Sequence, residues 1–343
     1  MTHFQEEIYE QPAVLAGILA DTVLKDAAAV LQKRDPSLIL TLARGSSDNA
    51  VTFFSYLAGQ YLGLPVASLP PSLFTVYKSK LKPEDALAIG VSQSGESSDV
   101  VESLKALAGA GAITLSVSNV SGSSLESFAD FVINQGAGQE QAVAASKTFS
   151  SQMMVLACLV AHWSGEVGLK DALEHVPEQL SRLLENTDEI ERVALRLTHA
   201  ESAYVLGRGL SYACSLELAL KLKETAYLHA QAYSSAEFQH GPIASVDRSD
   251  PILLLGTDDE TLQSNKDVAE RLRDVGADLT VLSSQQELLG LSSAKVSLPQ
   301  NLHPVTEAFL QVVAGQLLAL HLALSKGINP DAPRHLKKVT KTL

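Results

Sequence analysis

Two short segments rich in hydroxyl side chains could bind a phosphate group in this 343-residue sequence. The first is Gly45-Ser46-Ser47, and the second is SQSGESS from Ser92 to Ser98. Hydroxyls and backbone N–H groups at the start of a helix hold phosphate without needing Lys or Arg. The same residue types are also common in ordinary turns and helix caps. The phosphate interpretation therefore depends on whether both segments follow strands of a parallel sheet, where such ligands bind.

A second group of residues has the chemistry to move protons. Glu217, Lys221 and Glu224 lie four and three residues apart, so one helix face would carry a carboxylate, an ammonium and a carboxylate. Triplets of this kind are also common as solvated surface ion pairs. His240 precedes a Gly-Pro pair, and a histidine in a rigid loop can shuttle protons near neutral pH, although a lone histidine is more often structural.

An internal repeat indicates which elements position these residues. Three segment pairs recur in the same order, and each contains a short apolar strand. The pairs are ILTLARGSSDNA (39–50) with YVLGRGLSYAC (204–214), DALAIGVSQSGESSD (85–99) with DPILLLGTDDETLQS (250–264), and GAITLSVS (111–118) with GADLTVLSS (276–284). Arg44-Gly45 thereby aligns with Arg208-Gly209.

Apolar strands that alternate with amphipathic helices are typical of a parallel sheet covered on both faces. The sequence therefore predicts an α/β protein with two similar domains, each a flavodoxin-like three-layer α/β/α sandwich. We expect an N-terminal helical segment packed on the first domain (1–33), a first domain (34–165), a helical linker (166–198), a second domain (199–328) and an irregular tail (329–343).

The two repeats differ at the loop that would hold phosphate. Where the first repeat has its hydroxyl-rich loop, the second has Thr257-Asp258-Asp259-Glu260. Three carboxylates would repel a phosphate group, so we expect only the first domain to bind one.

Composition excludes several classes of protein. Hydrophobic residues make up 46% and charged residues 19%, which is ordinary for a globular chain. The net charge of −13 would repel nucleic acid. The longest apolar stretches, 153–160 and 309–324, are interrupted or amphipathic, so no membrane span is expected. The N-terminus lacks a secretion signal, and Cys158 and Cys214 offer neither a disulfide framework nor a metal cluster, so a cytoplasmic location is expected.

Five motifs make the chain resemble a tandem SIS (sugar isomerase) protein, of the type found as the isomerase domain of glucosamine-6-phosphate synthase. The resemblance covers nearly the whole chain. The motifs are ARGSS (43–47), SQSGESSD (92–99), GQEQAVAASKTFSSQ (138–152), LGRGLSYACSLELALKLKETAYLHAQAYSSAEFQHGP (206–242) and DAPRHLKK (331–338).

The resemblance implies roles for individual residues. Glu224 would move a proton between C1 and C2 of an open-chain sugar, His240 would assist ring opening, and Lys338 would form a Schiff base with the keto sugar. The implied phosphate contacts are Ser47, Ser92, Gln93, Ser94 and Ser97, the last in place of the usual Thr. Further implied substrate-binding residues are Glu140, Val143, Glu217, Lys221 and Arg334. Ala145 departs from the family, which has a Ser that contacts the sugar at this position.

The resemblance also implies partners and a reaction. No metal or other cofactor is implied, and the family histidine reaches the neighbouring subunit's cleft, so a homodimer is expected. The family synthases begin with a glutaminase domain and a terminal Cys, whereas this chain begins MTHFQEE, so glutamine-dependent transfer is not expected. We therefore expect a glucosamine-6-phosphate deaminase that releases fructose 6-phosphate and ammonium. The alternatives are a ketose-amine 6-phosphate deglycase, a phosphosugar aldose/ketose isomerase, and a non-catalytic sugar-phosphate sensor.

Overall fold

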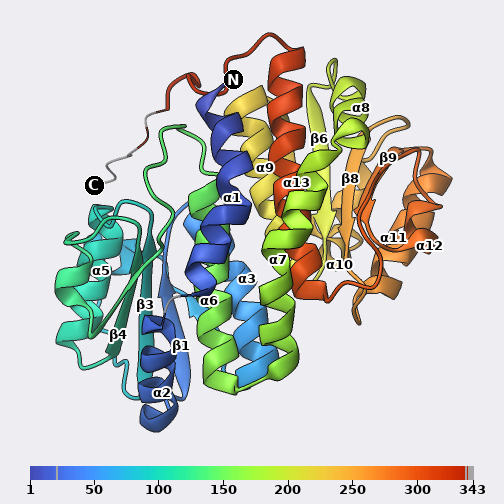
Figure 1. The fold of residues 1–343 in the computed structure, drawn as a ribbon. Helices are drawn as coiled ribbons and strands as arrows, with labels where there is room; N and C mark the ends of the chain where they lie inside the picture. The colour runs from blue at the N-terminus through green and yellow to red at the C-terminus, as the bar shows by residue number, and fades with distance from the viewer. Residues whose placement is uncertain (21, 337, 339–343) are drawn as a thin grey trace. The chain divides into compact units, whose positions relative to one another are not determined.

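The computed structural model describes residues 1–20, 22–336 and 338, and it divides into two compact units (Figure 1). The N-terminal unit comprises residues 13–140 and 147–174 together with the described chain end from Leu336. The C-terminal unit comprises residues 1–12, 141–146 and 175–335. The division falls inside two helices, α1 (His3–Leu19) and α7 (Val167–Glu185).

The N-terminal unit contains a five-stranded parallel sheet in the order β2-β1-β3-β4-β5. Its strands are β1 (Leu38–Leu42), β2 (Val66–Ser68), β3 (Ala86–Ser92), β4 (Ile113–Ser118) and β5 (Phe131–Asn134). β1 pairs with β3, so that Leu42 lies opposite Gly90 and the two strands end side by side. The chain leaves β1 toward one edge of the sheet and returns in β3 on the other side. Such a switch point is where sheets of this strand order bind ligands.

Helices cover both faces of this sheet (Figure 1). They are α2 (Val23–Arg34), α3 (Ser46–Leu62), α4 (Ser72–Thr75), α5 (Ser98–Gly109), the short 3₁₀ helix η1 (Glu126–Phe128) and α6 (Lys147–Ser164). Val100 and Leu104 of α5 pack on Leu40 and Ala88 of the sheet, because apolar residues recur at helical spacing along α5. On the other face, α3 packs against α6.

The C-terminal unit repeats this topology. Its parallel sheet has the order β10-β9-β8-β6-β7, which is the same order when counted from its own first strand. The strands are β6 (Ser202–Gly207), β7 (His229–Ser234), β8 (Pro251–Gly256), β9 (Asp278–Ser283) and β10 (Ala294–Ser297). The helices are α8 (Asp188–Arg196), α9 (Leu210–Ala226), α10 (Ser235–Phe238), η2 (Pro242–Ser245), α11 (Leu262–Val275), α12 (Gln286–Leu289) and α13 (Pro304–Ser325).

The predicted fold class, two similar α/β domains with parallel sheets, is confirmed. The expected packing of the N-terminal segment is only partly right. α2 packs on α6 in the N-terminal unit, but residues 1–12 belong to the C-terminal unit. Asp331 explains this difference, because its carboxylate accepts hydrogen bonds from the backbone N–H groups of His3 (2.8 Å) and Phe4 (2.9 Å) and so caps α1 from the far end of the chain.

The expectation about apolar stretches needs a correction at α13. This 22-residue helix is long and apolar enough to span a membrane by length and composition. However, 83% of its most apolar window is buried inside the protein, where it packs against α9 and α8. Burial of this kind is what a core helix of a globular domain shows, since the helix is hydrophobic all round.

Candidate active site

The loop after β3 folds into a compact turn lined with hydroxyl groups. Ser92 Oγ accepts a hydrogen bond from the Gly95 N–H (3.2 Å) and lies 3.4 Å from Ser97 Oγ. Ser94 Oγ accepts from the Glu96 N–H (3.2 Å). Gly95 permits the turn because its φ is +67° and a methyl group there would meet Ser123. The strand, turn and helix order is the one expected for a phosphate cradle.

The one carboxylate of this loop is held by a neighbouring loop. Glu96 accepts hydrogen bonds from Ser124 through both the Oγ (2.7 Å) and the backbone N–H (2.8 Å). The hydrogen bonds from Ser124 lower the pKa of the Glu96 carboxyl, so this side chain stays ionised and bound to Ser124.

The second hydroxyl segment lies beside the first. Ser47 is buried in the first turn of α3, directly after β1. Arg44 Nε donates a 2.8 Å hydrogen bond to Asp99 Oδ2 at the start of α5. This contact joins the loop after β1 to the loop after β3. The structure thus brings the predicted phosphate residues of both loops together at the switch point, with Gln93 half-buried between Ser92 and Ser94.

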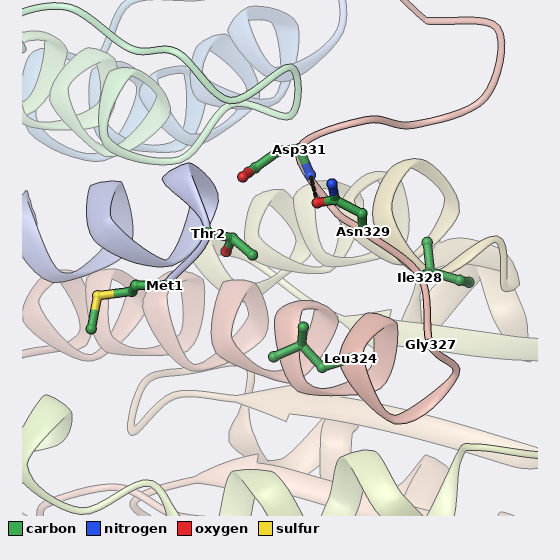
Figure 2. A pocket seen from close by; sticks show the side chains of 7 residues that line it. All are labelled: Met1, Thr2, Leu324, Gly327, Ile328, Asn329 and Asp331. Carbon is green, nitrogen blue, oxygen red and sulfur yellow. Dashed lines mark hydrogen bonds between the residues drawn. The ribbon is translucent and has the colours of Figure 1, made fainter.

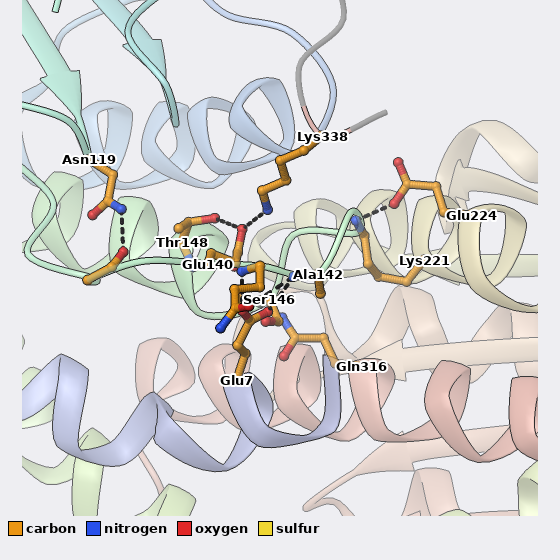
Figure 3. A network of polar contacts seen from close by, with 12 residues as sticks. Glu7, Asn119, Glu140, Ala142, Ser146, Thr148, Lys221, Glu224, Gln316 and Lys338 are labelled. Atoms are coloured by element: carbon orange, nitrogen blue, oxygen red, sulfur yellow. Dashed lines mark hydrogen bonds and ion pairs between the residues drawn. The ribbon is translucent and has the colours of Figure 1, made fainter. Parts of the chain in front are cut away.

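In the C-terminal unit, α9 carries a triad of charges, of which Figure 3 shows Lys221 and Glu224. Lys221 Nζ lies 2.5 Å from Glu224 Oε2 and 3.4 Å from Glu217 Oε1. The side chains of Lys221 and Glu217 are 1% and 2% exposed, whereas that of Glu224 is 23% exposed. The alternative of a solvated surface ion pair is therefore wrong. Buried charges are retained only when paired, and Glu224 is the member of the triad that solvent can reach.

A second ion pair involves the lysine near the end of the chain (Figure 3). In the N-terminal unit, Lys338 Nζ donates to Glu140 Oε2 at 2.5 Å. The Glu140 side chain is fully buried, and it also accepts hydrogen bonds from the Thr148 Oγ1 (2.7 Å) and N–H (3.1 Å) at the start of α6. Glu140 is therefore fixed in place and offers one oxygen to the lysine.

The segment 141–146, which contains the predicted residue Val143 and the family departure Ala145, is held from within the C-terminal unit. The Glu7 carboxylate accepts hydrogen bonds from the backbone N–H groups of Gln141 and Ala142. Val143 and Ala145 are both half-buried. Both lie on an irregular segment whose backbone is held by a helix far away in sequence.

The two remaining predicted residues lie on exposed parts of the C-terminal unit. His240 follows α10 and is exposed, and within the described chain its imidazole makes no hydrogen bond. Arg334 stacks its guanidinium on the Tyr227 ring, 4.6 Å from the ring centroid, and its backbone N–H donates to the Tyr227 hydroxyl (2.9 Å). Tyr227 directly follows α9, so the tail is anchored at the end of the helix that carries Glu224.

Comparison with known proteins assigns the family. The SIS domain matches twice, at residues 34–162 and 196–326, which together make up most of the chain. The chain belongs to the SIS domain family.

Three relatives support this assignment, and a fourth protein shares the fold. Over 98% of its length the SIS chain is 34% identical to glutamine–fructose-6-phosphate aminotransferase (isomerizing) of Aquifex aeolicus, and it spans 57% of that protein. It is 36% identical to a candidate phosphosugar isomerase of Silicibacter pomeroyi (TM-score 0.88, covering 96% of this chain and all of the other). It is 27% identical to the C-terminal domain of glucosamine-fructose-6-phosphate aminotransferase from Francisella tularensis (TM-score 0.85, covering 97% and 98%). At 24% identity, a glucosamine-6-phosphate deaminase of Thermotoga maritima shares the fold (TM-score 0.79, covering 99% and 100%).

In the second SIS repeat, a carboxylate of the equivalent loop accepts hydrogen bonds from donors of that same loop. In the loop after β8, Asp259 accepts hydrogen bonds from the Thr257 hydroxyl (2.8 Å) and from the Thr261 N–H (2.8 Å). Donors that would face a ligand anion in the first repeat thus bind an internal carboxylate in the second. That only the first repeat binds phosphate stays a prediction.

Several supporting residues were missed from the sequence. Glu7, Thr148, Asp99 and Tyr227 each hold a predicted segment or side chain in place. Asp99 is the last residue of the motif SQSGESSD, and its position at a helix start could have indicated a contact with the neighbouring loop. Glu7 contacts residues more than 130 positions away, and no local pattern indicates such a pair.

An open depression on the C-terminal unit holds none of the predicted residues (Figure 2). It is lined by Met1, Thr2, Leu324, Gly327, Ile328, Asn329 and Asp331. Asn329 Oδ1 accepts from the Asp331 N–H (3.0 Å), which shapes the start of the tail. The depression therefore marks where the tail leaves α13.

The cysteines and metal-binding residue types contribute no further site in the described residues. No group of three or more His, Cys, Asp or Glu there is arranged to hold a metal ion. Burial raises the pKa of the Cys158 thiol to about 12, and burial also raises that of Cys214. Both thiols therefore stay protonated and unreactive near neutral pH.

Proposed function

We propose that this tandem SIS protein is an isomerising glucosamine-6-phosphate deaminase, which converts glucosamine 6-phosphate and water into fructose 6-phosphate and ammonium. The observation that carries the proposal is the Lys338 side chain bound to the buried Glu140 carboxylate. An amine held in this way is the group needed to exchange nitrogen at a sugar carbon. The phosphate would lie in the cradle formed by the loops after β1 and β3.

Glu224 is proposed as the base of the isomerisation. After ring opening, which we assign to His240, the substrate has an aldehyde at C1 and an amino group at C2. Glu224 takes the proton from C2 and delivers it to C1, while the C1 oxygen gains a proton and the C2 amino group loses one. The C1 aldehyde thereby becomes an alcohol and C2 becomes an imine. A carboxylate is ionised near neutral pH and can act as this base. The ammonium of Lys221 keeps the Glu224 carboxylate oriented at 2.5 Å.

Lys338 is proposed to remove the nitrogen. Its neutral amine adds to the C2 imine and displaces ammonia, which forms a Schiff base between Nζ and C2. Water then adds to C2, the C–N bond breaks, and fructose 6-phosphate leaves with the lysine amine restored. The Glu140 carboxylate is placed to accept the proton that Lys338 must lose before it attacks.

The alternative functions differ in which of these residues they require. An aldose/ketose phosphosugar isomerase needs the proton transfer of Glu224 but no amine. A ketose-amine 6-phosphate deglycase would also use the lysine, so it differs in the group attached to nitrogen. A non-catalytic sensor would need neither the buried triad nor the lysine.

Assembly and location complete the proposal. We propose a homodimer in which the exposed His240 acts in the neighbouring subunit's site, and a cytoplasmic location. The exposed imidazole, which has no hydrogen-bond partner in the described chain, supports a role outside its own unit.

The test follows both products from one substrate. The protein is incubated with glucosamine 6-phosphate, and ammonium and fructose 6-phosphate are measured together. Equal release of the two products supports the deaminase. Interconversion of tagatose or galactose phosphates without ammonium favours an isomerase, and release of lysine from fructosyl-lysine 6-phosphate favours a deglycase. Product formation from fructose 6-phosphate and glutamine would instead assign aminotransfer.

A further inference from the structure

Arg44 is the basic residue that directly precedes the first hydroxyl segment, and neither 45–47 nor 92–98 contains a Lys or Arg. A phosphate monoester carries close to two negative charges near neutral pH. Hydroxyls and N–H groups can satisfy its oxygens with hydrogen bonds, but they carry no net charge to balance it. The positive charge that balances the phosphate must therefore come from a residue outside these two segments.

The guanidinium of Arg44 is fixed on one edge and open on the other. Its Nε binds Asp99 Oδ2 at 2.8 Å. The Asp99 side chain is only 4% exposed, and its other oxygen accepts from the Val100 N–H (3.0 Å). The Arg44 side chain is 52% exposed, and among the described residues its Nη groups donate no hydrogen bond. A planar guanidinium held in this way is suited to bind phosphate oxygens.

The surroundings of Arg44 are otherwise acidic. Asp48 stands in the first turn of α3, and burial raises its pKa, while a hydrogen bond from Ser68 and the positive charge of Arg44 lower it. With Asp48 and Asp99 on either side, a cradle without this arginine would repel a phosphate dianion. Arg44 offsets that repulsion.

The aligned turn of the second repeat lies beside an internal carboxylate. Arg208, which aligns with Arg44, donates to Ser264 Oγ at 2.5 Å. Asp259 Oδ2 lies 3.7 Å from the position of a methyl group built on Gly209. A methyl group built on Gly45, the aligned glycine, meets nothing within 4 Å. The Arg-Gly turn therefore faces an internal carboxylate in one repeat and open space in the other.

We propose that Arg44 is the specificity-determining residue that makes the first cradle selective for a phosphate dianion over an unphosphorylated sugar. Asp99 is its positioning residue. The inference that the ligand contains a sugar rests on the proposed function. The inference that Arg44 binds phosphate does not, because inorganic phosphate alone should bind.

The experiment compares Arg44→Gln with Arg208→Gln, the matched change in the second repeat. Calorimetric titrations measure the Kd of inorganic phosphate, fructose 6-phosphate and unphosphorylated glucosamine for each variant. We expect Arg44→Gln to weaken binding of both phosphate ligands about 10- to 100-fold, with a smaller dependence on salt, as for loss of a charge-assisted contact. Arg208→Gln and glucosamine binding should stay within about twofold of the parent. The double variant Arg44→Gln/Asp99→Asn removes the unpaired buried carboxylate, so it provides the same comparison if the single variant does not fold.

Each outcome bears on the inference. Unchanged phosphate binding by Arg44→Gln overturns it, and so does equal weakening by Arg44→Gln and Arg208→Gln, since that would be a general structural effect. A parent that binds no inorganic phosphate also overturns it. The parent protein could instead bind phosphate through Arg44 without turning over glucosamine 6-phosphate. That result would contradict the proposed reaction but would support the role of Arg44 in phosphate binding.

Discussion

Glu224 differs from its two charged neighbours on α9 in its access to solvent. Lys221 is buried between two carboxylates, and only Glu224 of the three reaches solvent to an appreciable extent. The proposed role of Glu224 as the base can therefore be tested by changing this one side chain.

Glu224→Gln should abolish proton transfer while it preserves binding. The amide keeps the shape and a hydrogen bond but cannot take a proton from carbon, so we expect kcat to fall about 10³-fold with KM within a few-fold. Solvent deuterium exchange at C1 and C2, followed by NMR, measures the step directly. Glu224→Asp, which keeps a carboxylate, should retain part of the exchange. Normal exchange in Glu224→Gln would show that another group is the base.

Lys338 should be trapped by reduction. Borohydride added during turnover should link the sugar phosphate to Nζ, which intact-protein mass spectrometry detects as a single adduct. Lys338→Ala should give no adduct, and Glu140→Gln should give less of it, because the carboxylate that holds the lysine and accepts its proton is gone. Lys326→Ala, at a lysine bound to the Ala200 carbonyl, is the control and should be trapped like the parent. An adduct of equal yield in Lys338→Ala would place the amine elsewhere.

At the scale of elements, the turn between β3 and α5 depends on one glycine. A methyl group at Gly95 would lie 2.2 Å from Ser123 Oγ and 2.3 Å from Ser123 Cβ, and φ is +67°. Gly122 has a similar φ of +75°, but a methyl group there meets nothing within 4 Å. Comparing alanine substitutions at the two positions therefore separates the cost of a positive φ from the cost of a steric clash with Ser123.

We expect Gly122→Ala to lower the free energy of unfolding by about 1 kcal/mol and Gly95→Ala by about 3 kcal/mol, since overpacking adds to the strain of positive φ. Urea denaturation of both variants measures the difference. Phosphate affinity should fall only in Gly95→Ala, where the hydroxyl loop must shift. Equal effects of the two substitutions would show that Ser123 moves aside freely.

The start of α13 contains a buried carboxyl group that makes stability depend on pH. Glu307 is fully buried and accepts hydrogen bonds from the N–H groups of Ser284 (2.7 Å) and Asp258 (3.3 Å). Burial, the largest effect, raises its pKa to about 7. The folded protein therefore binds this proton more tightly than the unfolded chain does.

The stabilising contribution of protonated Glu307 is complete below the pKa of the unfolded chain, near 4.5, and is lost as the pH rises to about 7. Between these values we expect the free energy of unfolding to fall by about 3 kcal/mol more in the parent than in Glu307→Gln. Urea titrations at pH 5 and pH 8 test this. The same pH slope in both proteins would assign the dependence to other groups.

The repeated elements explain how much was predictable. The expected strand at 87–91 and the helix start near Asp99 correspond to β3 at Ala86–Ser92 and α5 from Ser98, because apolar periodicity and turn residues are local signals. That the acidic loop at 258–260 excludes phosphate stays a prediction, and the structure adds only that Asp259 accepts a hydrogen bond from the Thr261 N–H in this loop. In contrast, Asp331 on α1 and Glu7 on the segment 141–146 are long-range contacts between polar residues. Such pairs depend on the folded topology and leave no pattern in the sequence.

At the scale of the whole molecule, two SIS repeats have the same strand order but different chemistry. The N-terminal unit keeps an open hydroxyl cradle, and the C-terminal unit has filled its own and carries the charged helix α9. We therefore expect one phosphate site in a chain that contains two similar sheets.

The proposed exchange of His240 between subunits predicts complementation. Unfolding and refolding a mixture of His240→Ala and Glu224→Gln chains should produce mixed dimers with one intact site. Random pairing then restores about a quarter of the parent activity, although each variant alone is nearly inactive. Sedimentation confirms that both variants are dimers. No recovery from an active parent dimer would place His240 in its own subunit's site.

The most direct test of the account is the stoichiometry of turnover with glucosamine 6-phosphate. Ammonium by coupled assay and fructose 6-phosphate by NMR are followed in one reaction, with Glu224→Gln and Lys338→Ala measured alongside. The account predicts one ammonium for each fructose 6-phosphate in the parent and loss of both in the two variants. Fructose 6-phosphate or ammonium alone, or no reaction with a parent that binds the substrate, would contradict it.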